Sequence, residues 1–179
     1  MRTFVIATLA MLVAVPASAE STMEKSGINS VFGIAPSTED FVTEAATGDM
    51  FEVASSKLAL ERSDDATKAF AQQMINDHTK TSADLKALIA SHKINVTLPT
   101  AVTSAQQEML DKLQKLQGES FTRKYHANQV RANTDAVDLF KRYGNGGDQV
   151  DIKEWARKTL PTLERHLDMA NVLNRKPAS

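Results

Sequence analysis

The sequence predicts an all-α protein, an antiparallel four-helix bundle with a short extra helix in the connection between the second and third long helices. Apolar residues recur at the three- and four-residue spacing of helices through most of the chain. No segment shows the alternation of β-branched residues that is typical of strands. Turn residues closely follow the first and third long segments, whereas a longer connection joins the second to the third, as in a pair of helical hairpins.

The first 19 residues, MRTFVIATLAMLVAVPASA, have the pattern of a signal peptide. Arg2 precedes an apolar run that is too short to span a bilayer, which takes ~20 residues. The run ends at Ala17-Ser18-Ala19, the small-residue pattern of a cleavage site. We therefore expect cleavage near Ala19 and a periplasmic or secreted protein.

Residues 20–36 predict a flexible leader, because they contain Gly27, Gly33 and Pro36 and show no helical period. The helical domain is expected over residues 37–175, followed by a short tail, 176–179.

The first long helix is expected from Thr38 to about Arg62. Ser37 followed by Asp40 resembles a capping box, with Asp in place of the usual Glu. Ser63-Asp64 ends this helix and starts a second one, which runs to about His92.

Residues 93–102 form the connection, and Ser104 with Gln107 predicts the capped start of a short helix that reaches about Leu116. A third long helix is expected from about Glu119 to Tyr143.

The run Gly144-Asn145-Gly146-Gly147 is the strongest turn pattern in the chain. The last helix then runs from near Asp148 to about Arg175. Pro161 inside it predicts a kink, because proline lacks a backbone donor and clashes with the preceding turn.

Composition excludes several classes of function. The formal net charge is −1 and there is no basic run, which argues against nucleic acid as a partner. The absence of cysteine excludes thiol catalysis and disulfides. There is also no G-x-S-x-G, G-x-G-x-x-G or phosphate-binding loop motif, so no catalytic residue is predicted.

Each long helix carries one polar residue in the middle of its apolar stripe or beside it. These residues are Glu52, His78, Asn133 and His166. At ~1.5 Å of rise per residue, Glu52 and His78 lie ~15 Å and ~21 Å from the first turn, and Asn133 and His166 ~15 Å and ~25 Å from the glycine turn. These distances along the helices are compatible with a single site that contains all four residues, and they do not require one.

Imidazole and carboxylate on facing helices are the usual ligands of a metal site inside a bundle. The residues three before the four histidines are Ile75, Ile89, Arg123 and Leu163, so the Glu-x-x-His motif of di-iron proteins is missing. Glu52, His78 and His166 are the candidate ligands.

Structural roles stay open for these side chains. Each histidine could be a core residue that is hydrogen-bonded to a carboxylate or a carbonyl, and Glu52 could be its partner. Asp77 could orient His78 or lie in solvent. His92 and His126 are expected at the surface or at helix ends.

Four segments, in this order and spacing, resemble a bacterial family of exported proteins known as domain of unknown function 4142. The segments are FVTEAATGDMFEVASSKLALERS, KAFAQQMINDHTKTSADLKAL, FTRKYHANQVRANTDAVDLF and LPTLERHLDMA. The resemblance covers about residues 41–173. Its most specific motifs are Asp77-His78-Thr79 and Leu160-Pro161 followed by His166-Leu167. It implies a ferritin-like bundle, and members often carry the description of outer-membrane proteins.

The resemblance also implies which positions matter. Glu52, His78 and His166 match positions where family members commonly carry Glu, His and His. Asn133 departs from the pattern, because many members have a histidine there. If the family site binds metal through three histidines, either Glu52, water or His126 completes the site in this chain, or this member binds no metal.

Two hypotheses follow. The first is a non-enzymatic binding or stress-related envelope protein, with the polar residues fixing the register of the bundle and the surface binding a protein or an envelope component. Metal binding in the core is compatible with it. The alternative is a metal-dependent protein in metal handling or oxidative-stress defence. Zinc suits nitrogen and oxygen ligands best, and copper and iron remain candidates.

Overall fold

The computed structural model describes residues 28–175, and every regular element in this range is a helix. The all-α prediction is therefore confirmed for this part of the chain. The expected signal peptide, the start of the leader and the tail lie outside the described residues. The helices are α2 (Ile28–Val31), α3 (Thr38–Arg62), α4 (Asp65–Ser91), α5 (Ser104–Gln114), α6 (Gly118–Gly146) and α7 (Val150–Arg175).

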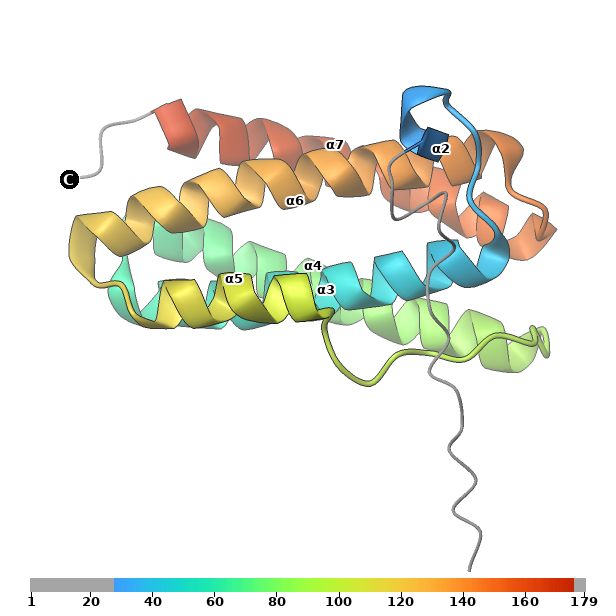
Figure 1. The fold of residues 1–179 in the computed structure, drawn as a ribbon, viewed down its shortest axis with the longest axis horizontal. Coiled ribbons are helices and arrows are strands. Elements are labelled where there is room, and N and C mark those ends of the chain that lie inside the picture. Colours follow the sequence, from blue (N-terminus) through green and yellow to red (C-terminus); the bar gives the residue numbers. More distant parts are fainter. Residues whose placement is uncertain (1–27, 176–179) are drawn as a thin grey trace, which may run out of the picture.

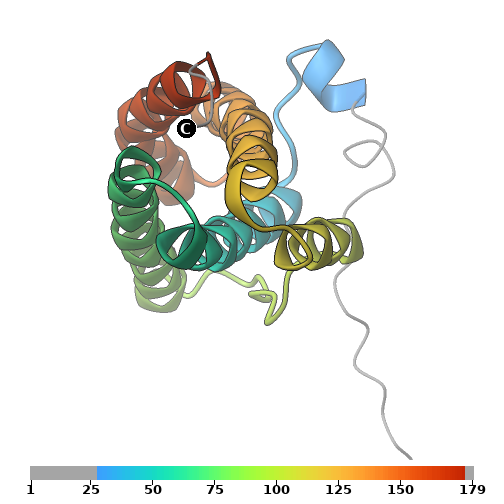
Figure 2. The ribbon, with the colours of Figure 1, turned by 90° about the vertical axis from the view of Figure 1, so that its left-hand side faces the viewer.

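The four long helices surround one interior. Viewed along their axes, α3, α4, α7 and α6 follow one another around it, and each packs against the next (Figure 2). Neighbouring helices run in opposite directions (Figure 1). The connection after α4 carries α5, which packs on the outside of α3 beside α6.

The starts of α3 and α4 agree with the sequence. Ser37 caps α3: its hydroxyl oxygen accepts a hydrogen bond from the backbone N–H of Asp40 at 3.1 Å and donates to the Asp40 carboxylate at 2.9 Å. Asp64 caps α4 by accepting from the backbone N–H of Thr67 at 2.9 Å. Both caps satisfy backbone donors that have no partner within the helix.

The predicted cap of α5 was wrong by one residue. Thr103, and not Ser104, is the cap, and Gln106 completes the capping box by accepting from the backbone N–H of Thr103 at 2.9 Å. The sequence offers two overlapping registers of the same motif, Thr103 with Gln106 and Ser104 with Gln107, and the earlier one forms.

The glycine run is not a turn along its whole length, because α6 continues through Gly144 to Gly146. A Cβ on Gly144 would lie only 3.1 Å from the Cγ of Arg157, so this glycine allows α6 and α7 to approach closely. The Arg157 Nε donates to the carbonyl of Gly144 at the same contact. The turn is confined to residues 147–149.

Two expectations about the other segments can be compared with the structure. Helix α7 is continuous through Pro161, and a kink at that residue stays a prediction. The segment expected as a leader without helical structure contains the single turn α2.

Two apolar clusters fill the interior, one toward each end of the long helices. The Phe41 cluster centres on the start of α3, where the ring of Phe41 stacks on Tyr143 with a centroid distance of 4.1 Å. The Phe70 cluster centres on Phe70, Met74, Phe121 and Tyr125. On each long helix, the residues of the two clusters stand on either side of a short polar stretch. The core is thus divided by a buried polar layer, which contains Asp49 and Glu52 of α3, His78 of α4, Gln129 and Asn133 of α6, and His166 of α7.

The described helices include none that is long and apolar enough to cross a membrane.

We expect Phe41→Ala to lower the free energy of unfolding by about 3–5 kcal/mol, because it removes a fully buried ring from a packed cluster and leaves a cavity. The matched control is Phe32→Ala, since the ring of Phe32 is 73 % exposed, and its effect should stay within about 0.5 kcal/mol. Urea denaturation followed by circular dichroism measures both. Equal effects of the two substitutions would contradict the placement of Phe41 in the core.

Candidate functional site

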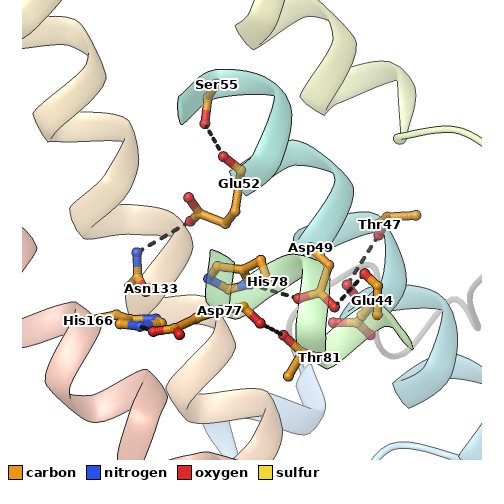
Figure 3. A network of polar contacts seen from close by, with 11 residues as sticks. Glu44, Thr47, Asp49, Glu52, Ser55, Asp77, His78, Thr81, Asn133 and His166 are labelled. Carbon is orange, nitrogen blue, oxygen red and sulfur yellow. Dashed lines mark hydrogen bonds and ion pairs between the residues drawn. The ribbon is translucent and has the colours of Figure 1, made fainter. Parts of the chain in front are cut away.

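The four polar residues that the sequence placed on the four long helices come together in the buried layer. Glu52 comes from α3, His78 from α4, Asn133 from α6 and His166 from α7, and each is at most 3 % exposed. Their side chains turn toward the space between the helices (Figure 3). The Nδ2 of Asn133 donates to the Oε1 of Glu52 at 3.3 Å, and the rings of the two histidines lie 5.4 Å apart, centroid to centroid.

Each histidine in the layer binds a carboxylate through one ring nitrogen. His78 Nδ1 lies 2.7 Å from the Oδ1 of Asp49, and the hydroxyl of Ser82 donates to the other oxygen of Asp49. His166 Nε2 lies 2.7 Å from the Oδ2 of Asp77. Such contacts fix the orientation of the ring and decide which nitrogen stays available.

Asp77 takes neither of the two roles considered for it, because its carboxylate orients His166 and not His78. Consecutive residues on a helix project in different directions, so Asp77 faces α7 while His78 faces the centre. The residue that orients His78 is Asp49, which the sequence analysis missed. Its position three residues before Glu52, on the same face of α3, was a signal that could have identified it.

Several polar atoms of the layer have no hydrogen-bond partner within the described part of the chain. They are Glu52 Oε2, His78 Nε2, Gln129 Oε1, Asn133 Oδ1 and His166 Nδ1. A buried polar atom without a partner costs about 1–3 kcal/mol, so such atoms are rare in folded proteins. Their concentration in one layer marks a place that is suited to receive a ligand.

The environment alters the protonation of the layer. Burial raises the pKa of Glu52 from 4.5 to about 7, although the positive charge of His78 opposes the shift. Burial lowers the pKa of His78, but the hydrogen bond and the charge of Asp49, together with the charges of Glu52 and Asp77, outweigh it, and the net shift of the pKa is upward. Burial lowers the pKa of His166, against the effect of Asp77. At neutral pH, His166 is thus a neutral imidazole.

The remaining histidines lie outside the layer. His126, considered as a substitute ligand, is 5 % exposed and hydrogen-bonds through Nε2 to the hydroxyl of Thr67 in the first turn of α4. Its expected place at the surface or at a helix end was wrong, because it lies within α6 and its ring contacts the first turn of α4. His92 pairs with Asp151 at 2.7 Å in a half-exposed position, as expected of a surface residue.

The layer supplies donors for a metal ion, but their present positions do not form a complete ligand set. Within residues 28–175, no three side chains among His, Asp and Glu are placed to hold one ion together. His78 Nε2, His166 Nδ1 and Glu52 Oε2 are the atoms that have no other partner. Binding of one ion by all three would therefore require a rearrangement of these side chains.

A family model described as "Domain of unknown function (DUF4142)" matches residues 24–173. No curated protein and no solved structure matches the chain.

We expect Glu52→Gln to remove a pH dependence of stability in the metal-free protein. The folded state holds the proton of Glu52 up to a pKa of about 7, whereas the unfolded state releases it near 4.5. Stability from this group is therefore complete below pH 4.5 and is lost as the pH rises to about 7. At 1.36 kcal/mol per pKa unit, the loss is roughly 3 kcal/mol.

Urea denaturation between pH 4 and pH 8 in the presence of EDTA measures this effect. Relative to the unsubstituted protein, the Glu52→Gln variant should gain stability as the pH rises. Glu119→Gln, which changes an exposed carboxylate on α6, is the control and should change little at any pH. Parallel curves for the unsubstituted protein and the Glu52→Gln variant would contradict the assignment.

Proposed function

The chain belongs to the family described as a domain of unknown function (DUF4142), and we propose that it is an exported, non-enzymatic binding protein whose buried layer holds a divalent metal ion. The proposal includes a ferritin-like, antiparallel four-helix bundle. Support for that architecture comes from the antiparallel neighbours and the long connection after α4. The proposed periplasmic location rests on the signal-peptide pattern of residues 1–19.

One observation carries the metal proposal. Two neighbouring buried histidines each bind a carboxylate through one ring nitrogen, while the other nitrogen has no partner. Histidines that bind metals have this arrangement, because the carboxylate orients the ring and raises the basicity of the free nitrogen. A histidine with a purely structural role has no need to leave its second nitrogen unpaired in the core.

The proposed ligands are His78 Nε2, His166 Nδ1 and Glu52 Oε2. Two imidazoles and one carboxylate are compatible with zinc, and also with copper or iron. The Oδ1 of Asn133 is a fourth oxygen in the same layer and has no partner. Asn133 stands where the resemblance implies a histidine, so in this chain an amide oxygen or water takes the place of an imidazole.

Binding and not catalysis is proposed because the unpartnered atoms of the layer are ligand donors, including two imidazole nitrogens and a carboxylate oxygen. An ion held by these residues suits a role in metal handling or in a stress response of the cell envelope. Glu52 would bind the ion as a carboxylate. Since its pKa is about 7, a fraction of the molecules carries a proton on Glu52 at neutral pH, and metal binding would release that proton.

The competing explanation is that the polar layer only fixes the register of the helices. It predicts that replacing both members of each pair, Asp49 with His78 and Asp77 with His166, by apolar residues leaves function intact and raises the melting temperature, as happens for other buried ionic groups. The metal proposal predicts loss of metal together with loss of function.

We expect the protein, purified from periplasm without a tag or chelators, to contain close to one equivalent of zinc, copper or iron. His78→Ala and His166→Ala should each weaken metal binding at least tenfold, because each removes a ligand. His92→Ala removes an exposed histidine that lies outside the layer and should leave binding unchanged. Mass spectrometry of metals and titration with a competing chelator measure these effects.

Absence of metal after purification, together with no uptake on titration, would overturn the proposal. Equal metal affinity in the unsubstituted protein and a His78→Ala/His166→Ala double variant would place any bound metal elsewhere on the molecule.

A further inference from the structure

A cavity of about 720 Å³ reaches the polar layer from one side of the molecule. It lies between α3 and α6, next to the first turns of α5, which packs beside both helices (Figure 2). Arg131 and Asp135 of α6, both largely exposed, line its outer part. Glu52 and His78, both buried, line its inner part. The cavity thus joins the outside of the molecule to part of the layer.

Gly48 enlarges this cavity from the middle of α3. A glycine inside a helix is destabilising, so it usually serves a turn, a positive φ or a close approach. Gly48 has none of these reasons: its φ is not positive, and a Cβ built on it would meet nothing within 4 Å. The absence of a side chain at Gly48 leaves open space in the cavity, one helical turn before Glu52.

The charges along the cavity favour a cation. Its lining includes two ion pairs, Asp49 with His78 at 2.7 Å and Asp135 with Arg131 at 3.8 Å. Glu52 is in neither of these pairs, and its Oε2 has no partner. No lysine is among the described lining residues. A buried carboxylate oxygen without a partner attracts a positively charged donor.

The size and the walls of the cavity indicate an organic ligand. Pockets for small molecules commonly measure about 300–1,000 Å³, and a single metal ion would leave most of this one unfilled. Phe51, Met109, Leu139 and Phe140 supply apolar walls. A ligand that suits both features has an apolar body and one positively charged end.

We propose that the cavity binds a small primary amine, with its ammonium group on the Glu52 carboxylate and its apolar body against Phe51, Leu139 and Phe140. This inference goes beyond the proposed metal binding and does not rest on it. Because Glu52 belongs to both sites, an amine and a metal ion would exclude each other. The amine site is therefore tested on metal-free protein.

The first test is calorimetric titration of the full chain in EDTA at pH 8. Phenethylamine and hexylamine should bind saturably with one site per chain. The neutral 2-phenylethanol should bind at least tenfold more weakly, and 3-phenylpropanoate should not bind, because a charge-assisted hydrogen bond to Glu52 is lost or becomes repulsion. Failure of both amines to bind, or equal affinity for phenethylamine and the alcohol, would overturn the proposal.

The second test separates binding in the cavity from binding elsewhere. Gly48→Met should fill the cavity and weaken phenethylamine binding at least tenfold, and Gly48→Ala, the matched control, should weaken it less than threefold. Neither should unfold the protein, since both improve helix propensity and the space beside Gly48 is open. Glu52→Gln should remove the preference for the amine over the alcohol. Unchanged amine affinity in the folded Gly48→Met variant would overturn the proposal.

The two proposals fail separately. Metal binding is tested by the effect of His166→Ala on metal content, and His166 is not among the described residues that line the cavity. Amine binding is measured by calorimetry on the metal-free protein.

Discussion

Burial of polar groups between the two apolar clusters is the constraint on which the rest of the structure depends. The layer holds the carboxylates of Asp49 and Glu52 with two imidazoles, and moving charged groups out of water costs several kcal/mol each. Contacts within the layer offset much of this cost, because each histidine has a carboxylate partner at 2.7 Å. The Phe41 and Phe70 clusters hold the helices together on either side. The position of the layer is therefore set by apolar packing at both ends.

Three hydrogen bonds of the layer's side chains join one long helix to another. Asp49 with His78 joins α3 to α4, Asp77 with His166 joins α4 to α7, and Asn133 with Glu52 joins α6 to α3. The remaining neighbours, α6 and α7, meet where Arg157 donates to the Gly144 carbonyl. A shift of any long helix by one turn would break at least one of these contacts, so the layer defines a register that apolar packing alone leaves less specific.

Most of the helices could be predicted from the sequence, because their apolar spacing and caps are local properties. The capping pattern at Ser37 formed as expected, whereas at Thr103 two registers of one motif competed and local rules could not choose between them. Glu52, His78, Asn133 and His166 could be placed in the interior because each interrupts an apolar stripe. The spacing of Asp49 from Glu52 places Asp49 on the same face of α3, but which histidine Asp49 or Asp77 contacts depends on how the helices pack. The cavity beside Gly48 depends on where α5 lies, which no local pattern encodes.

One carboxylate in or beside the layer has no cationic partner. Asp49 pairs with His78 at 2.7 Å, and Asp77 lies 3.6 Å from the NH2 of Arg165, whereas Glu52 is in no ion pair of the described residues. Burial raises the pKa of Glu52 to about 7, because the charge of His78 and a hydrogen bond offset the loss of solvent only in part. Asn133 binds one oxygen of Glu52 but brings no charge. A divalent ion or an ammonium group at the second oxygen of Glu52 would supply a positive charge. The unpaired carboxylate of Glu52 therefore favours either ligand.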